Sequence, residues 1–356
     1  MVDCCFKCGQ RPTAGGKLRM CGGCQTAKYC TDLCQRGHWS EHKPVCKILG
    51  AARERAVFSL TRAAEEGDLA AATKLLETGN VNKALADGRT ALIMAVQSGH
   101  LALVAALLDA GAKVNKTIVV QGMNRSTTPL ILAAKHGHLA VVKALLEAGA
   151  ELDNAVEASF TPLYVAAEGG HVAVVKVLLE AGADANKAGG DNGSTPLHIA
   201  TYSGHEAVVK VLLEARADAN KADHNSFTPL YVATQKRHEA LVKVLLEAGA
   251  DANTATTFGY EATALHLAAQ NGHLAVVKAL LEAGADPDKA SNDGCTALFT
   301  AVTKGYTTVV KVLLDAGADA NKTLNTGCTP LQAAVHCGNL AVVKVLLHAG
   351  AEPTGR

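Results

Sequence analysis

The chain of 356 residues is long enough for two domains, and its 49% share of apolar residues is typical of folded protein. Its formal net charge is only +1, which disfavours binding of phosphate backbones by the chain as a whole. No uncharged apolar run approaches 18 residues, and the polar, cysteine-rich start is unlike a secretory signal. We therefore expect an intracellular protein, in the cytoplasm or the nucleus, with no membrane segment.

The first 46 residues hold eight of the eleven cysteines. Nothing in the sequence points to an oxidising compartment, so metal binding is favoured over disulfides. Seven of these thiols and one imidazole form four pairs, enough for two tetrahedral zinc sites with every position filled, which predicts structural zinc. Cys4 is left over and is the alternative to its neighbour in the first pair. The candidate ligands are Cys5, Cys8, Cys21, Cys24, Cys30, Cys34, His42 and Cys46.

The details of this segment resemble the MYND zinc finger. They are Tyr29-Cys30, Cys34-Gln35 and Trp39-x2-His42-x3-Cys46, and the resemblance covers residues 5–46. A RING finger would instead place its histidine near the middle of the ligand order. The resemblance implies interleaved sites, the first zinc held by Cys5, Cys8, Cys30 and Cys34 and the second by Cys21, Cys24, His42 and Cys46. A segment this small has little core, so zinc would supply its folding energy.

The resemblance also implies a peptide-binding role for the finger. Gln35 and Trp39 match the family's groove for short peptides that contain proline and leucine. The alternative is that Trp39 only packs the finger together. Residues 1–50 are formally +5, and metal-bound thiolates with two zinc ions reduce this to about +2. Such a charge is weak for nucleic acid, which remains a minor hypothesis.

From about residue 58 onward one unit of some 33 residues recurs. Aligned threonines are separated by steps of 33 to 38 residues, and a fixed period in this range indicates a stacked repeat array. The eight copies start near Thr90, Thr128, Thr161, Thr195, Thr228, Thr263, Thr296 and Thr329.

One copy shows how the unit folds. Thr263 is suited to cap a short helix, and five copies carry proline directly after the threonine, where its missing N–H costs nothing. Gly272 permits a turn, and Gly284 fits a left-handed end to a second helix. The apolar face of that second helix is predicted to contain Leu274, Val277, Leu280 and Leu281.

This pattern, with T-P-L-H at Thr195–His198 followed by A-A, G-H, V-V-x-x-L-L and A-G-A-D, resembles the ankyrin repeat. The resemblance implies a mostly α-helical solenoid of helix–turn–helix and β-turn units, preceded by the small two-zinc finger. We expect a finger over residues 1–50 and an array over 51–356, with a divergent first unit at about 58–89. The last unit repeats the apolar pattern of internal copies, so we expect it to fray or to be covered by a partner or a second chain, a shortened gene product being the further alternative.

The resemblance places protein binding on the concave face, formed by the turn residue before each threonine and the residues after A-A. We expect Phe160 and Phe227 at exposed tips, the alternative being that they pack against neighbouring turns. The candidate partner-binding residues are Arg89, Phe160, Tyr202, Phe227, Gln235, Lys236, Gln270 and Asn271.

Several recurring residues are predicted to be structural. His198 and His266 share the T-P-L-H position, and other histidines follow the turn glycine in successive copies. Cys295 and Cys328 are one repeat apart, or about 10 Å, which is too far for a disulfide.

Three departures from the repeat stand out. Arg216 and Arg237 replace glycines that should have left-handed backbone, at a cost of roughly 1 kcal/mol each. The longest step adds residues at Lys113–Thr127, which predicts a projecting loop.

No G-x-x-x-x-G-K-[ST], H-E-x-x-H or G-x-S-x-G motif is present, and the finger and the repeats occupy nearly all of this sequence, so we expect no catalytic domain in it. We therefore expect a non-enzymatic adaptor that holds a folded partner on the array and a linear peptide on the finger. The alternatives are a transcriptional or chromatin corepressor adaptor, a nucleic-acid-binding finger and a ubiquitin-ligase component.

Overall fold

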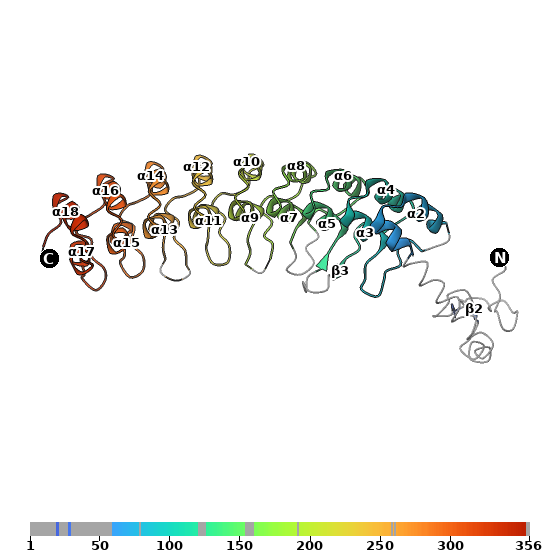
Figure 1. Cartoon of the computed structure of the whole chain (residues 1–356), viewed down its shortest axis with the longest axis horizontal. Helices are drawn as coiled ribbons and strands as arrows, with labels where there is room; N and C mark the ends of the chain where they lie inside the picture. The colour runs from blue at the N-terminus through green and yellow to red at the C-terminus, as the bar shows by residue number, and fades with distance from the viewer. Residues whose placement is uncertain are drawn as a thin grey trace, which may run out of the picture. The chain divides into compact units, whose positions relative to one another are not determined.

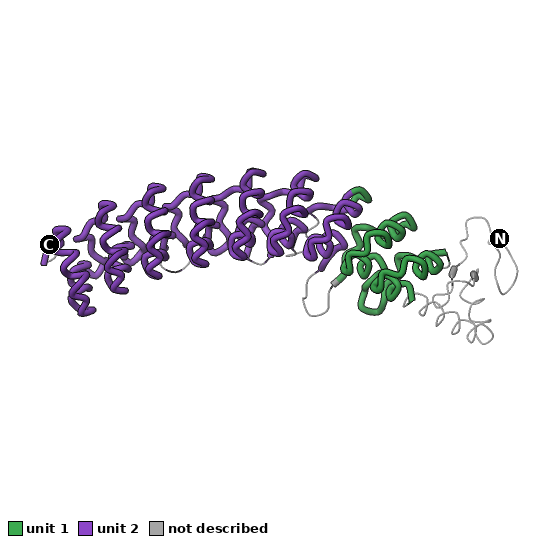
Figure 2. The backbone as a smooth tube through the Cα atoms, turned by 45° about the horizontal axis from the view of Figure 1, so that its top comes forward, with its two compact units in different colours: residues 1–124, 147–149 green, residues 125–146, 150–356 purple. Residues whose placement is uncertain are grey.

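The computed structural model describes residues 19–20, 28–29, 59–77, 80–119, 126–153, 160–190, 192–257, 259 and 261–353. The chain divides into two compact units (Figure 2). Unit 1 comprises Met1–Asn124 and Glu147–Gly149, and unit 2 comprises Arg125–Leu146 and Ala150–Arg356. The eight candidate zinc ligands, Gln35 and Trp39 lie outside the described residues.

Unit 1 begins with a short antiparallel pair, β1 (Arg19–Met20) and β2 (Lys28–Tyr29). Arg19 is opposite Tyr29, and Met20 is opposite Lys28. Residues 59–66 are helical, and the elements that follow are α2 (Leu69–Leu76), α3 (Ala91–Ser98), α4 (Leu101–Asp109) and β3 (Ile118–Val119).

Unit 2 consists of helix pairs. Its first helices form one row, its second helices form another, and the connecting loops extend from the row of first helices (Figure 1). The strand β4 covers Ser126–Thr127. The first helices are α5 (Pro129–Lys135), α7 (Pro162–Glu168), α9 (Pro196–Tyr202), α11 (Pro229–Lys236), α13 (Ala264–Asn271), α15 (Ala297–Lys304) and α17 (Pro330–His336). The second helices are α6 (Leu139–Glu147), α8 (Val172–Glu180), α10 (Glu206–Glu214), α12 (Glu239–Glu247), α14 (Leu274–Glu282), α16 (Thr307–Asp315) and α18 (Leu340–His348).

The aligned threonines start the first helix of every pair, as predicted. In each copy the threonine has extended backbone and its hydroxyl accepts a hydrogen bond from the N–H three residues later, which satisfies a donor that the helix leaves unpaired. The hydroxyl of Thr161, for example, lies 3.1 Å from the nitrogen of Tyr164. The capping residues are Thr90, Thr128, Thr161, Thr195, Thr228, Thr263, Thr296 and Thr329.

Burial in the copy that starts at Thr263 follows the helical period with one correction. Ala268 and Ala269 of α13 are fully buried, and these small side chains allow α11 and α15 to pack closely on either side. In α14 the buried residues are Val276, Val277 and Leu280. Leu274 and Leu281, predicted for the same face, are only half-buried because they lie at its two edges.

The glycine predictions are confirmed. Gly272 has φ 69° and Gly284 has φ 85°, both in the left-handed region. Arg216 (φ 62°) and Arg237 (φ 60°) take the same conformation without glycine's freedom. Cys295, Cys328 and Cys337 are free thiols. Of the predicted projecting loop, residues 120–125 lie outside the described part, and Ile118 just before them is buried.

Polar side chains connect successive copies of unit 2. The Nε2 atoms of His171 and His205 each lie 3.0 Å from a carbonyl oxygen of the preceding copy, on Lys135 and Glu168. In the loops, Asn220 donates to the Gly249 carbonyl at 3.1 Å and accepts from the next copy's backbone. The prediction that the recurring histidines are structural is therefore confirmed at these positions.

Within the residues that the structure describes, none of the helices has the length and apolar character needed to span a bilayer. The same residues contain no cluster of histidine, cysteine and acidic side chains suited to a metal ion.

Candidate protein-binding surface

The two candidate phenylalanines are half-buried, so the expectation of exposed tips was wrong. The ring of Phe160 stacks on Tyr164 with centroids 4.5 Å apart, and Phe227 stacks on Tyr231 at 5.0 Å. In each case the tyrosine is the third residue of the helix that follows the phenylalanine, and its ring lies against the phenylalanine ring of the preceding loop. Each phenylalanine therefore packs on its own repeat's first helix through an aromatic pair.

Tyr202 and Lys236 come together from neighbouring copies. Tyr202, at the end of α9, is 52% exposed, and the Lys236 Nζ lies 3.7 Å from the centroid of its ring. Hydrogen bonding from Lys236, followed by its positive charge, lowers the pKa of the Tyr202 hydroxyl. A cation held over an exposed aromatic face gives this part of the surface both charge and a flat apolar area.

The remaining candidates are exposed polar side chains. Gln235 and Gln270 are exposed near the ends of α11 and α13. Asn271 is exposed, and its side chain donates to the Leu267 carbonyl at 2.9 Å. Arg89 belongs to unit 1, where its Nε lies 2.7 Å from the Asp87 carboxylate.

A small pocket of about 190 Å³ lies in unit 2 between α11, α13, α15 and the loop that precedes α15. Gln270 is the one predicted partner-binding residue that lines it. His266 and Cys295, which were predicted to be structural, also line it, and Asp293 was not predicted, although its position three residues before a capping threonine is also that of Asp87. Among the residues lining the pocket are Tyr231, Leu267, Gln270, Asp293, Cys295 and Thr300.

The electrostatics of the pocket are dominated by Asp293. Its Oδ1 accepts from the Ser291 hydroxyl and from the Cys295 N–H, at 3.1 Å for the latter. Hydrogen bonding from Ser291 is the main reason that the pKa of this carboxyl is lowered, so the side chain is anionic at neutral pH. Burial raises the pKa of the Cys295 thiol, which keeps it neutral. The pocket therefore has a negative rim and uncharged walls.

His266 also lines this pocket, and both of its ring nitrogens make hydrogen bonds to the backbone. Its Nδ1 accepts from the Thr263 N–H at 3.2 Å, so Nε2 carries the proton and donates to the Cys295 carbonyl at 2.9 Å. Burial lowers the pKa of His266, and the ring is neutral. A histidine with both nitrogens bonded in this way holds the loop in position and is not available as a ligand.

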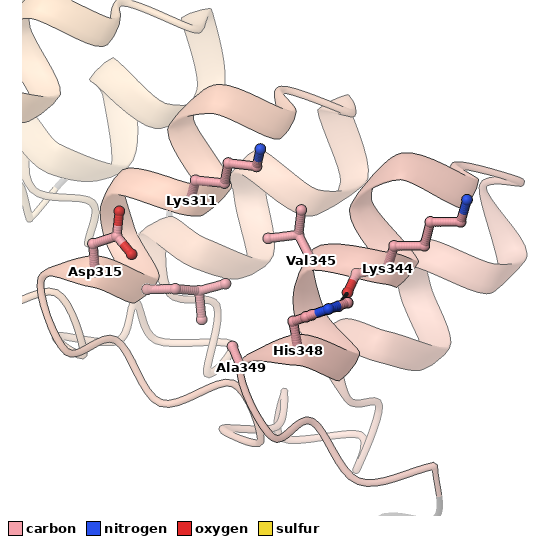
Figure 3. A pocket seen from close by; sticks show the side chains of 7 residues that line it. Lys311, Asp315, Lys344, Val345, His348 and Ala349 are labelled. Carbon is pink, nitrogen blue, oxygen red and sulfur yellow. Dashed lines mark hydrogen bonds between the residues drawn. The ribbon is translucent and has the colours of Figure 1, made fainter.

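A second, wider hollow of about 520 Å³ lies between α16 and α18 in the other row of helices (Figure 3). Lys311 and Lys344 extend at its edges, and His348 is held by a 2.9 Å contact from Nδ1 to the Lys344 carbonyl. The three side chains come from the solvent-facing sides of helices, and no predicted residue lies among them.

The stacked helix pairs of unit 2, capped by threonine and connected by polar side chains from copy to copy, define a helical repeat protein. Comparison with protein families identifies the kind of repeat. The family described as ankyrin repeats (3 copies) matches in overlapping segments that together cover residues 60–356, so the chain belongs to the ankyrin-repeat family. The MYND finger family matches residues 5–46. Both are non-catalytic domains, and both are associated with protein–protein interaction.

MYND fingers bind two zinc ions, so zinc is the cofactor that this N-terminal segment implies. The donor set fits, because seven thiolates and one imidazole complete two four-coordinate sites. Bound zinc would hold the segment together, and the seven cysteine thiols would have to lose their protons to bind it. The assignment of each ligand to its zinc stays a prediction.

Proposed function

We propose that the protein is a non-enzymatic adaptor. Its ankyrin array holds one folded protein on the side formed by the first helices and their loops, and its finger captures a short peptide containing proline and leucine. The observation that supports the array's role is the exposed side chains there, above all Tyr202 with Lys236 across its ring. Aromatic and cationic residues of this kind are enriched at binding hot spots.

The proposal divides the chain near residue 50, with the finger over 1–50 and the array over 51–356. It assigns the first zinc to Cys5, Cys8, Cys30 and Cys34, and the second to Cys21, Cys24, His42 and Cys46. Two modest sites on one chain raise the overall affinity for a partner, or a pair of associated partners, that engages both. Gln35 and Trp39 are the finger residues proposed to contact the peptide.

Affinity capture from a native lysate tests this function. Three full-length forms are compared with the unchanged protein: Trp39→Ala in the finger, a Tyr202→Ala/Lys236→Ala double variant in the array, and Lys243→Ala as a control. Lys243 is exposed on α12, in the other row of helices, so its loss should leave capture intact. The proposal expects the finger and array variants each to lose a distinct set of partners.

Two results would contradict parts of the proposal. If Trp39→Ala alone removes every partner, the array only supports the finger. If neither variant loses a partner that the control retains, the proposed surfaces are wrong. Measured zinc content and circular dichroism of each form must match those of the unchanged protein, so that loss of capture is not loss of folding.

A further inference from the structure

The loops before α3, α11, α15 and α17 share one pair of backbone hydrogen bonds, and those before α3 and α15 also carry an aspartate at the same position. Before α3 the N–H of Leu85 donates to the Arg89 carbonyl at 2.8 Å, and that of Gly88 donates to the Leu85 carbonyl at 3.0 Å. Before α15 the N–H groups of Ser291 and Gly294 make the equivalent bonds, both at 2.9 Å. Gly88 and Gly294 have φ of 87° and 83°. The two loops therefore direct their side chains alike, and Asp293 corresponds to Asp87.

In the first of these loops the aspartate holds an arginine of its own chain. The Asp87 carboxylate accepts from the Arg89 N–H through Oδ1 at 3.0 Å and from the Arg89 Nε through Oδ2 at 2.7 Å. The guanidinium also contacts the Met94 sulfur at 3.7 Å, on the helix that follows. The Arg89 guanidinium is thus held by the Asp87 carboxylate through Nε and by the Met94 sulfur of α3 through another nitrogen.

In the second loop the same carboxylate has no arginine. Cys295 stands at the position of Arg89, and its N–H still donates to Asp293 Oδ1. Asp293 Oδ2 makes no hydrogen bond or ion pair with any residue that the structure describes. Thr300 occupies the position of Met94. The Cys295 sulfur lies 3.3 Å from the Thr300 hydroxyl, so this short pair takes the place of the arginine and methionine, and no guanidinium reaches the carboxylate from within the loop.

Asp293, Cys295 and Thr300 all line the 190 Å³ pocket described above. Among the described residues that line it there is no lysine or arginine to neutralise the Asp293 charge. Tyr231 is half-buried and stacks one face on Phe227, and Leu267 adds an apolar wall. Gln270 is exposed at the rim and offers a carbonyl oxygen. A carboxylate beside an aromatic ring and an amide is suited to a planar cation with several N–H donors.

We propose that this pocket binds an arginine side chain presented by the protein partner, with the guanidinium on Asp293 Oδ2 in place of the internal arginine that the equivalent loop carries. The aliphatic part of the side chain packs along Leu267 and Tyr231. Arginine is favoured over lysine because its flat guanidinium carries donors for Asp293 and for Gln270 together. This inference rests on the proposed role of the array in binding a protein.

The test uses the full-length, zinc-loaded protein and N-acetyl-arginine amide as the probe, at low salt. Binding is followed by NMR from the backbone amides of Gly294, Cys295 and Thr300 and from the Gln270 side-chain amide. N-acetyl-citrulline amide, which has the same shape without charge, and N-acetyl-lysine amide are the comparison probes. We expect saturable shifts with arginine, and binding weaker by about fivefold or more with citrulline.

Three variants locate the site. Asp293→Asn keeps an oxygen for Ser291 and Cys295 but removes the charge, and should weaken arginine binding by about fivefold or more. Cys295→Arg recreates the arrangement of Asp87 and Arg89, and should block the probe by filling the pocket from within. Cys328→Arg is the matched control, because its loop has the same backbone bonds but carries Thr326 where the carboxylate would be. It should bind the probe as the unchanged protein does.

Equal binding by Asp293→Asn and the unchanged protein would overturn the proposal, as would equal binding of the citrulline and arginine probes. Neither result would affect partner capture by the array, which the Tyr202 and Lys236 variants test separately. Arginine binding that is lost in both Asp293→Asn and Cys295→Arg supports the pocket even if lysate capture assigns the principal partner to the finger.

Discussion

The Nε2 atom of His198 lies 2.8 Å from the carbonyl oxygen of Phe227, one repeat further along the chain. Its Nδ1 lies 3.2 Å from the backbone nitrogen of Thr195, and the Thr195 hydroxyl accepts from the His198 N–H. One imidazole therefore caps its own helix and fixes the loop of the next copy. The cap needs the neutral ring, because Nδ1 must remain an acceptor for the Thr195 N–H.

This arrangement predicts a pH-dependent stability. Burial lowers the pKa of His198 and His266 below the ordinary value of 6.5, so the unfolded chain binds protons that the folded chain does not. The contribution of these residues is complete above about pH 6.5 and is lost as the pH falls below it. We expect the urea concentration at the unfolding midpoint to decrease as the pH is lowered from 7.5 to 5.

A His198→Gln/His266→Gln variant should reduce that decrease. Gln332 occupies the same position in α17, where it closes the same capping arrangement with Thr329 at 3.0 and 3.1 Å. Glutamine is not titratable, so the cap should survive at every pH. An unchanged pH dependence in the variant would show that other groups cause it.

Two buried hydroxyls should be dispensable. Thr201 and Thr234 are fully buried, and the hydroxyl oxygen of each has no hydrogen-bond partner among the residues that the structure describes. Other copies have valine at this position, Val96 and Val302. We expect Thr201→Val and Thr234→Val each to raise the free energy of unfolding by about 1 kcal/mol, because an unsatisfied polar group no longer needs to be buried.

Thr303→Val is the control for that experiment. Thr303 is exposed, and its hydroxyl donates to the Thr300 carbonyl at 2.9 Å. Its replacement should change stability by no more than about 0.5 kcal/mol. If urea denaturation shows no higher free energy of unfolding for Thr201→Val and Thr234→Val than for this control, the buried hydroxyls do not destabilise the array.

The left-handed backbone of Arg216 and Arg237 should also lower the stability of the array. We expect Arg216→Gly and Arg237→Gly each to stabilise the array by up to about 1 kcal/mol, because glycine adopts this backbone without strain. Alanine at the same sites retains the Cβ atom and should give no gain. Thermal unfolding compares glycine with alanine at each site. Both variants lose the arginine side chain, so a higher melting temperature for glycine alone reports the relief of backbone strain.

Chelation should affect only one part of the chain. We expect two zinc ions per chain by elemental analysis, and their removal should unfold residues 1–46 while leaving the helical circular dichroism nearly unchanged. The described helices all begin after residue 58, so their signal reports on the array. Loss of most helicity on chelation would mean that the finger and the array fold as one.

The local structure of the array could be predicted because one pattern repeats. Eight threonines at nearly constant spacing identify eight helix starts, and each proved to be a cap. A single cap would be a weak signal, since threonine is common, but the period removes the ambiguity. The left-handed backbone at Arg216 and Arg237 followed from the glycines of the other copies.

The surface was harder to predict, because it depends on contacts between copies. Phe227 was expected to be exposed, and only the three-dimensional structure shows that the Tyr231 ring stacks on it. The pocket combines Tyr231, Gln270 and Asp293 from three consecutive copies, and no spacing rule joins them. The zinc ligands and Trp39 lie outside the described residues, and their roles stay predictions.

The capping arrangement of His198 and Thr195 is reproduced at His266 and Thr263 with the same distances, 3.2 Å between backbone nitrogen and Nδ1 in both. Two copies separated by a third thus close their helices identically, although their surface residues differ. The second bond of each histidine goes to a backbone carbonyl, which every residue type provides. The side chains that the array displays can therefore differ from copy to copy while the caps stay the same.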